Sequence, residues 1–292
     1  MRVSTFIVLT GFFFAGVAGL GAVEVRRDVV YGEAGGETLR LDIARPDGQG
    51  PFPVVILVHG GGWSGGDKAG TEKPGAGADI RPWFEPLTEA GFMWVSINYR
   101  LAPANRWPAC LEDTRAAVAW VRAHAVEFGG DPARIAIMGH SAGGHIALFA
   151  AVATEGGATP VRAVVGCAAV SDLESDSKRR GAPSTSLQAL FGLKAEMSPE
   201  NLAFLAAQSP VNVVKAGYPP TLLLHGDADK TVALDQSIAF RARLLALEGD
   251  CELHVLPGAG HRLAEWSAAD PGWSRVLTNW LHSKLGPAQA GR

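Results

Sequence analysis

The chain has 292 residues, of which 47% are hydrophobic, and it carries 26 Lys and Arg against 29 Asp and Glu, for a net charge of -3. A chain this apolar is not disordered over most of its length. Its balanced charge provides no broad positive surface for a nucleic-acid partner, so we expect none.

The N-terminal segment has the composition of a secretory signal peptide. Arg2 is followed by an apolar stretch without ionisable side chains, residues 5–20, and then by small residues and a charged cluster. We predict that residues 1–22 are a signal peptide and that the protein is exported, with cleavage after Ala18 or Ala22 left open. An uncleaved segment would anchor the chain, because it approaches the about 20 residues that span a bilayer. The cleaved chain is expected to keep no stable membrane span.

The next elements alternate between strands and helices. Apolar and polar residues alternate over residues 29–43 around Gly35-Gly36, which predicts an antiparallel hairpin of edge strands. Six continuous apolar runs then predict strands that are covered on both faces: Val54–Val58, Met93–Asn98, Ile135–Met138, Val161–Val170, Thr221–Leu224 and Glu252–Leu256. Helical spacing predicts the segments between and after them: Ala109–Phe128, Gly144–Ala153, Val232–Leu247 and Trp273–Leu285.

This alternation of strands and helices predicts one doubly wound α/β domain with a mostly parallel sheet. Residues 172–208 interrupt the alternation with a polar opening and two short helical pieces, so we expect a cap-like or lid-like insertion above the sheet. Whether the insertion moves is left open.

The three cysteines leave at least one thiol unpaired, and none lies in a C-x-x-C spacing that would indicate a redox or zinc site. Cys167 lies in an apolar run, which predicts a buried, inert thiol. A disulfide between Cys110 and Cys251 stays open, because sequence alone does not decide the pairing.

The most specific motif is Gly139-His140-Ser141-Ala142-Gly143, a G-x-S-x-G sequence between a predicted strand and a predicted helix. This is the context of a nucleophile elbow, in which the small residues let strand and helix approach each other. We predict that Ser141 is a nucleophile. The alternative is a Gly-Ser turn that caps a helix.

A second motif, His59-Gly60-Gly61-Gly62-Trp63, follows the first parallel strand. Its glycines allow backbone N–H groups to point into a cleft and hold a developing oxyanion. A phosphate-binding loop is the competing interpretation, but the G-x-x-x-x-G-K-[ST] arrangement is absent although Lys68 follows Gly65-Gly66.

A serine nucleophile needs a base, and the base needs a carboxylate to orient it. Of the eight histidines, only His261 lies in a Gly-rich loop after the last strand, whereas His140 and His145 flank Ser141 and are expected to shape the elbow. For the acid we favour Asp229 over Asp227, with Asp172 as a third candidate. The relevant loops leave the same edge of the sheet, where ligands of such sheets bind.

The combined motifs resemble the α/β-hydrolase superfamily, and more narrowly the esterase/lipase group related to hormone-sensitive lipase and to bacterial acetyl-xylan and feruloyl esterases. The similarity extends over nearly the whole mature chain and rests on five segments: His59–Lys68, Asn98–Pro103, Gly139–Gly144, His225–Val232 and Gly258–His261. It implies that residues 23–292 form a single α/β-hydrolase domain.

By this resemblance, Ser141, Asp229 and His261 are the nucleophile, the acid and the base of a catalytic triad. The N–H group of Ala142 would join those of Gly61 and Gly62 as oxyanion donors, with Trp63 as an alternative to one glycine. His59, Gly60 and Trp63 complete the motif at the substrate pocket. Arg100 and Asp113 are expected to form a structural pair. The chain has no large helical cap before the hairpin, which favours the compact esterases of the group over lipases for bulky lipids.

We therefore expect an exported serine carboxylesterase that acts on short-chain or carbohydrate-linked esters, either acetyl or feruloyl, without a metal or an organic cofactor. Its partner would be a small-molecule or oligosaccharide ester. Two alternatives are a serine peptidase of the prolyl-oligopeptidase type, although no propeller repeat is visible, and a non-catalytic binding protein, which normally has a broken triad. Four aromatic residues are candidates for a sugar or phenolic platform, against ordinary packing: Trp63, Trp83, Phe84 and Trp107.

Overall fold

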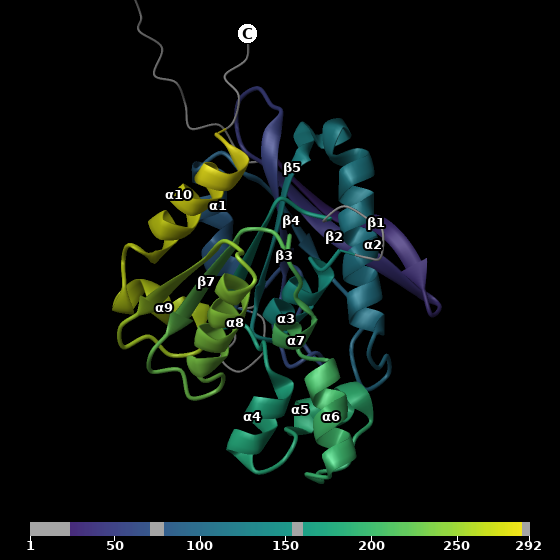
Figure 1. The fold of residues 1–292 in the computed structure, drawn as a ribbon. Helices are drawn as coiled ribbons and strands as arrows, with labels where there is room; N and C mark the ends of the chain where they lie inside the picture. The colour runs from purple at the N-terminus through teal and green to yellow at the C-terminus, as the bar shows by residue number, and fades with distance from the viewer. Residues whose placement is uncertain (1–23, 71–78, 154–159, 288–292) are drawn as a thin grey trace, which may run out of the picture.

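An eight-stranded sheet forms the centre of the described part of the computed structural model, residues 24–70, 79–153 and 160–287 (Figure 1). Its strand order is β1-β2-β4-β3-β5-β6-β7-β8. The strands are β1 (Glu24–Ala34), β2 (Glu37–Arg45), β3 (Phe52–Val58), β4 (Met93–Ile97), β5 (Gly130–His140), β6 (Ala163–Cys167), β7 (Thr221–Gly226) and β8 (Cys251–Leu256). The predicted signal peptide, residues 1–22, lies outside the described residues.

The first two strands form the predicted antiparallel hairpin, with Gly35 and Gly36 at its turn, both at positive φ. The hairpin is not made of two edge strands, however. β2 also pairs antiparallel with β4, so of the two hairpin strands only β1 lies at an edge of the sheet. The remaining strand pairs are parallel, which confirms the α/β-hydrolase type of sheet.

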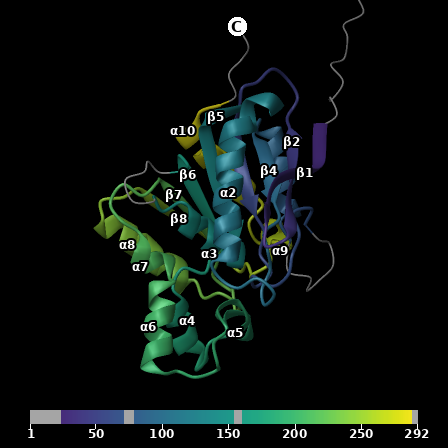
Figure 2. The same ribbon diagram turned by 90° about the vertical axis from the view of Figure 1, so that its right-hand side faces the viewer.

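Helices cover both faces of the sheet. The helices in the described part of the chain are α1 (Phe84–Glu89), α2 (Ala109–His124), α3 (Ala142–Ala150), α4 (Leu173–Arg180), α5 (Thr185–Phe191), α6 (Pro199–Ala207), α7 (Pro210–Val213), α8 (Asp235–Ala246), α9 (Leu263–Ala269) and α10 (Trp273–Leu285), with short 3-10 turns at Arg81–Trp83 and Ala125–Phe128. Helices α2, α3, α7 and α8 pack on one face, and α1, α9 and α10 pack on the other (Figure 2).

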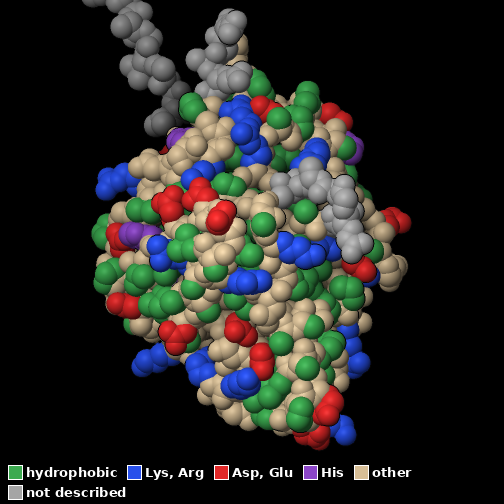
Figure 3. Space-filling model, viewed as in Figure 1, with side chains coloured by type: hydrophobic (Ala, Val, Ile, Leu, Met, Phe, Trp, Pro, Cys, Tyr) green, Lys and Arg blue, Asp and Glu red, His purple; other side chains and the backbone are tan. Residues whose placement is uncertain are grey.

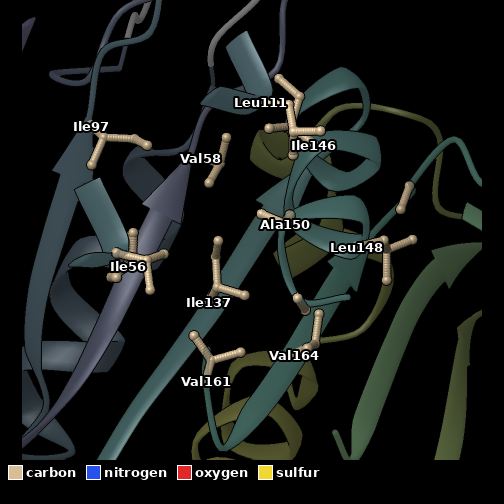
Figure 4. Close-up of a cluster of buried hydrophobic side chains, with 14 of the residues drawn as sticks. Ile56, Val58, Ile97, Leu111, Ile137, Ile146, Leu148, Ala150, Val161 and Val164 are labelled. Atoms are coloured by element: carbon tan, nitrogen blue, oxygen red, sulfur yellow. The ribbon is translucent and has the colours of Figure 1, made fainter. Parts of the chain in front are cut away.

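Strand β3 shows why its sequence is apolar throughout: all seven of its residues are buried. Val54, Ile56 and Val58 join the core under α2 and α3, whereas Val55 and Leu57 join the core on the opposite face. The residues of α3 that face this core include Ile146 and Ala150, next to Ile137 of β5 (Figure 4). Burial on both faces places the carboxyl end of β3 rigidly in the centre of the sheet.

The insertion, residues 172–208, contains three helices rather than two short pieces, because its polar opening is itself helix α4. Asp172 caps α4, and its carboxylate accepts the N–H of Ser175. Ser184 and Ser198 cap α5 and α6 in the same way. Such caps satisfy N–H groups that the first turn of a helix leaves unpaired.

The insertion leaves and rejoins the sheet domain at one place. Val211 N–H donates to Ser171 O at 3.0 Å, and Leu173 N–H donates to Ser209 Oγ at 2.8 Å. From this base, α4, α5 and α6 project as a group away from the two helical layers (Figure 1).

Arg100 and Asp113 form the expected structural pair between the end of β4 and helix α2. The Arg100 Nε–H group donates to both carboxylate oxygens of Asp113, and its NH2 group donates to Oδ1 at 2.7 Å. The backbone N–H of Arg100 also donates to Oδ2. Only 2% of the Asp113 side chain is exposed. The loop that follows the end of the sheet strand is thus fixed by a buried, multiply bonded ion pair.

Replacing Asp113 by alanine is expected to lower the free energy of unfolding by about 3–5 kcal/mol, because Arg100 would keep a buried charge without its partner. Urea denaturation measures this change. Glu112→Ala is the control: its carboxylate lies 3.5 Å from the same guanidinium but is 63% exposed, so its effect should stay within about 0.5 kcal/mol. Equal losses in the two variants would contradict this account.

All three cysteines are buried free thiols, so the pairing left open between Cys110 and Cys251 is not formed. Burial raises the pKa of the Cys110 and Cys251 thiols to about 12 and that of Cys167 further still.

Charged side chains of both signs are interspersed on the face shown in Figure 3. None of the described helices combines the length and the hydropathy that crossing a membrane requires.

Candidate active site

Ser141 lies at a sharp turn between β5 and α3, with φ 54° and ψ −119°. This conformation is costly for a residue with a side chain. The neighbouring glycines are required by close contacts: a Cβ on Gly139 would lie 2.1 Å from Gly143 O, and one on Gly143 would lie 2.3 Å from Val58 O and from His59 O. The elbow therefore packs by its backbone against the end of β3.

The structure brings Ser141, His261 and Asp229 together from three loops. His261 Nε2 lies 3.0 Å from Ser141 Oγ, and His261 Nδ1 lies 2.7 Å from Asp229 Oδ2. Because an ionised carboxylate only accepts hydrogen bonds, Nδ1 carries the proton and Nε2 is free to accept that of the serine hydroxyl. The arrangement can activate Ser141 as a nucleophile.

Asp229 is held as an ionised acceptor. Its Oδ1 accepts the N–H groups of Thr231 and Val232 at 2.8 and 2.9 Å. Burial alone would raise the pKa of this carboxyl, but hydrogen bonds from His225 and His261 and the N–H of Val232 hold it well below its ordinary value. A group with such a pKa stays charged at every pH near neutrality.

His225 is a site residue to which the sequence analysis gave no role, although it begins the segment His225–Val232 on which the resemblance rests. Its Nε2 donates to Val232 O at 2.9 Å and lies 3.4 Å from Asp229 Oδ2, and its Nδ1 contacts Ser237 Oγ at 2.7 Å. The available signal was its position directly after the apolar run of β7. His225 fixes the loop that carries the acid.

The other two candidate acids have different roles. Asp227 is exposed, and its Oδ1 accepts Gly258 N–H at 2.7 Å, which ties together the loops after β7 and β8. Asp172 caps α4. Neither carboxylate contacts His261, so the geometry selects Asp229.

The glycine loop presents its backbone to the same cleft. Gly61 and Gly62 have backbone φ angles of 112° and 60°, which residues with a side chain rarely adopt. A Cβ on Gly61 would also lie 2.2 Å from Gly65 O. Within the described residues, the N–H groups of Gly61, Gly62 and Ala142 donate to no protein acceptor. These three residues line the cleft around Ser141, and their N–H groups are free to bind an oxyanion.

His59 and Gly60 do not line the cleft, contrary to the prediction that they belong to the substrate pocket. The His59 ring is buried; its Nδ1 donates to Gly60 O at 2.7 Å, and the ring stacks on Tyr99 at 4.3 Å between centroids. Burial lowers the pKa of His59 to about 4, so the ring is neutral. Both residues support the loop from behind, because the ring fills the space under its backbone.

The cleft has a volume of about 700 Å³ and lies between the sheet loops and the insertion. Ser141, His261 and the glycine loop form one wall. The insertion contributes most of the facing wall: Asp176, Arg180, Ser184, Thr185, Ser186 and Leu187. Ser186 approaches the glycine loop closely, since a Cβ on Gly62 would lie 2.7 Å from its Oγ.

Ordinary packing, the alternative to an aromatic platform, holds for three of the four candidate rings. Trp63 lines the cleft, with 4% of its surface exposed. Trp83 is fully buried in the core on the far face, Phe84 stacks on Trp94, and Trp107 packs on His145 and on two phenylalanines. These three rings pack against the core, where they bury more apolar surface than at the cleft.

His140 and His145 connect the elbow to its surroundings. His140 Nε2 contacts His261 O at 2.9 Å, and His145 Nε2 contacts Gln208 O at 3.0 Å, at the end of the insertion. Both rings are buried; burial lowers the pKa of His140 to about 3 and that of His145 to about 4. Each neutral ring therefore donates its Nε2 proton to a backbone carbonyl.

Comparisons with known proteins point to esterases. The BD-FAE family model matches residues 41–244. Esterase LipC of Mycobacterium tuberculosis is 33% identical over 249 residues, which cover 81% of this chain and 59% of LipC. The probable carboxylic ester hydrolase LipM of the same organism is 36% identical over 225 residues, 73% of this chain and 50% of LipM. The chain thus spans about half to three fifths of the length of these relatives.

Solved structures agree with the fold. A truncated carbohydrate esterase from gut microbiota superposes with a TM-score of 0.75 and 27% identity, covering 89% of this chain and 96% of that chain. Esterase LipW from Mycobacterium marinum superposes with a TM-score of 0.70 and 27% identity, covering 92% and 82%.

Proposed function

The chain belongs to the BD-FAE family, and from this premise we propose that it is a carboxylic ester hydrolase in which Ser141 is the nucleophile, His261 the base and Asp229 the acid. The observation that carries the proposal is the continuous contact from Ser141 Oγ through His261 to Asp229, at 3.0 and 2.7 Å. The esterases among the relatives and the structural neighbours support it.

The reaction proceeds in two steps. Ser141 Oγ attacks the ester carbonyl as His261 Nε2 takes its proton, and the N–H groups of Gly61, Gly62 and Ala142 stabilise the oxyanion. The alcohol leaves with the proton from His261, and an acyl-enzyme remains. Water, activated by the same base, then hydrolyses this intermediate. In other serine hydrolases one oxyanion donor lowers the barrier by about 2.7–4 kcal/mol.

For the substrate we propose short-chain esters or carbohydrate-linked esters, either acetyl or feruloyl. The facing wall of the cleft presents the hydroxyl groups of Ser184, Thr185 and Ser186 together with the paired charges of Asp176 and Arg180. Hydroxyl and charged groups suit a polar, hydroxylated alcohol better than a lipid chain. The structural similarity to a carbohydrate esterase supports this substrate class.

The test is a panel of p-nitrophenyl esters of increasing acyl length, with acetylated xylan, methyl ferulate and an aminoacyl-nitroanilide. We expect kcat/KM to be highest for the shortest acyl groups and the anilide to be inert. Cleavage of the anilide in preference to every ester would contradict the proposal in favour of a peptidase. Absence of any turnover would favour a binding protein.

A further inference from the structure

Asp79 is a charged residue of the cleft that the mechanism does not use. It lies just before the 3-10 turn at Arg81–Trp83, far in sequence from the triad, and 13% of its side chain is exposed. Its Oδ2 accepts the N–H of Ala264 at 3.2 Å, three residues after His261, and lies 4.0 Å from Arg262 Nε. Asp79 thus holds the segment that follows the catalytic base.

His140 contacts the same segment at the backbone of His261. Its Nε2–H donates to His261 O at 2.9 Å, and the two rings lie 4.8 Å apart between centroids. Its Nδ1 is buried, has no hydrogen-bond partner among the described residues, and lies 3.7 Å from Asp79 Oδ1. Two hydrogen bonds therefore hold the segment around His261: His140 binds the carbonyl of His261, and Asp79 binds the N–H of Ala264.

We propose that Asp79 and His140 are positioning residues that together hold His261 within reach of Ser141. This inference rests on the proposed function of Ser141 and His261. Neither Asp79 nor His140 exchanges a proton with the substrate. They act through the backbone of the His261 loop, Gly258–His261, which is Gly-rich and is also bonded by Asp227 at Gly258 N–H and by Trp266 Nε1 at Gly260 O.

Asp79 and His140 reach the segment at two different atoms. The Asp79 carboxylate accepts the N–H of Ala264, and burial raises its pKa against the opposing effects of that N–H and of the nearby Arg262 and His261. Nδ1 of the His140 ring lies 3.7 Å from Asp79 Oδ1, which is too far for a hydrogen bond. Asp79 therefore acts through Ala264, and His140 acts through the carbonyl of His261.

The test compares removal and conservation of these hydrogen bonds. Asp79→Ala and His140→Met remove them, and we expect each to lower kcat for p-nitrophenyl acetate by on the order of 100-fold, the cost of misplacing a catalytic group by about 1 Å. KM should not change. In Asp79→Asn the amide oxygen can still accept the N–H of Ala264, and in His140→Gln the amide NH2 can still donate to His261 O, so kcat should return close to that of the wild type.

Glu265→Ala is the matched control, because its carboxylate lies 3.9 Å from Arg262 but is 54% exposed; it should leave kcat unchanged. The proposal is overturned if Asp79→Ala or His140→Met keeps wild-type kcat, if KM alone rises, or if the conservative variants are as slow as the others. Circular dichroism establishes that each compared variant is folded.

A second measurement needs no turnover. The proton between His261 Nδ1 and Asp229 gives a strongly deshielded ¹H NMR signal when His261 is held in place. We expect this signal in the wild type and in the two conservative variants, and its loss by solvent exchange in Asp79→Ala and His140→Met. If the wild type hydrolyses no ester, the proposed function fails, and the same spectra still decide the positioning role.

Discussion

Replacing Ser141 by alanine is expected to lower kcat for p-nitrophenyl esters on the order of a million-fold, the effect of removing the nucleophile in a serine hydrolase whose triad works as a unit. Alanine occupies the same backbone conformation with no larger side chain, so the elbow and its contacts with Val58 and His59 should persist. Stopped-flow and steady-state assays of purified protein measure the loss.

The control is Ser175→Ala, which removes an exposed hydroxyl from α4 and should leave kcat unchanged. A covalent readout complements the kinetics: an organophosphorus inhibitor should add its mass to the peptide that contains Ser141 in the wild type and not in the Ser141→Ala variant. Substantial turnover by Ser141→Ala, or a label on another serine, would refute the assignment of the nucleophile.

Asp229→Asn is expected to lower kcat by about 10⁴-fold through the tautomer of His261. The amide oxygen of asparagine can still accept the N–H groups of Thr231 and Val232, which directs its NH2 group toward His261 Nδ1. Nδ1 then becomes the acceptor and Nε2 carries the proton. The base no longer has a lone pair for Ser141.

Asp227→Asn is the matched control, because Asp227 lies two residues away and its bond to Gly258 N–H survives the change. Its kcat should equal that of the wild type, and equal losses in both variants would refute Asp229 as the acid.

The folded-state pKa of Asp229 is depressed. Its contribution to stability is therefore present above the ordinary pKa of 3.8 and is lost as the pH falls below that value. In Asp229→Asn the free energy of unfolding should therefore fall less steeply as the pH is lowered.

The parts of the molecule that depend on local patterns could be predicted. The continuous apolar runs identify the parallel strands because both faces of this sheet are buried, as in β3. The elbow could be recognised because strand, turn and helix follow one another within a few residues around Ser141. Bringing His261 within 3.0 Å of Ser141 across 120 residues needs only one further rule: parallel strands end at the same edge of the sheet.

The parts that depend on packing could not be predicted. Whether Trp83 faces a cleft or a core depends on how its loop folds back, and the ring is fully buried. The supporting role of His59 depends on the stacking partner Tyr99, which lies on another strand end. The positioning role of Asp79 depends on its contacts with Ala264 and His140, and no spacing in the sequence connects these residues to Asp79. Helix α4 was missed for a different reason. Most of its residues are charged, so no apolar periodicity indicates a helix, although Asp172 is a typical helix cap.

The closed base of the insertion has an evolutionary consequence. Because Ser171 and Val211 lie side by side and are joined by a hydrogen bond, residues 172–208 can lengthen, shorten or be exchanged between relatives at a small cost in loop-closure entropy. The sheet keeps its connectivity in each case, and Ser141 keeps its place. One wall of the cleft can thus change while the catalytic residues on the other wall keep their positions. A graft of this segment would transfer substrate preference from one member of the family to another without redesign of the reacting groups.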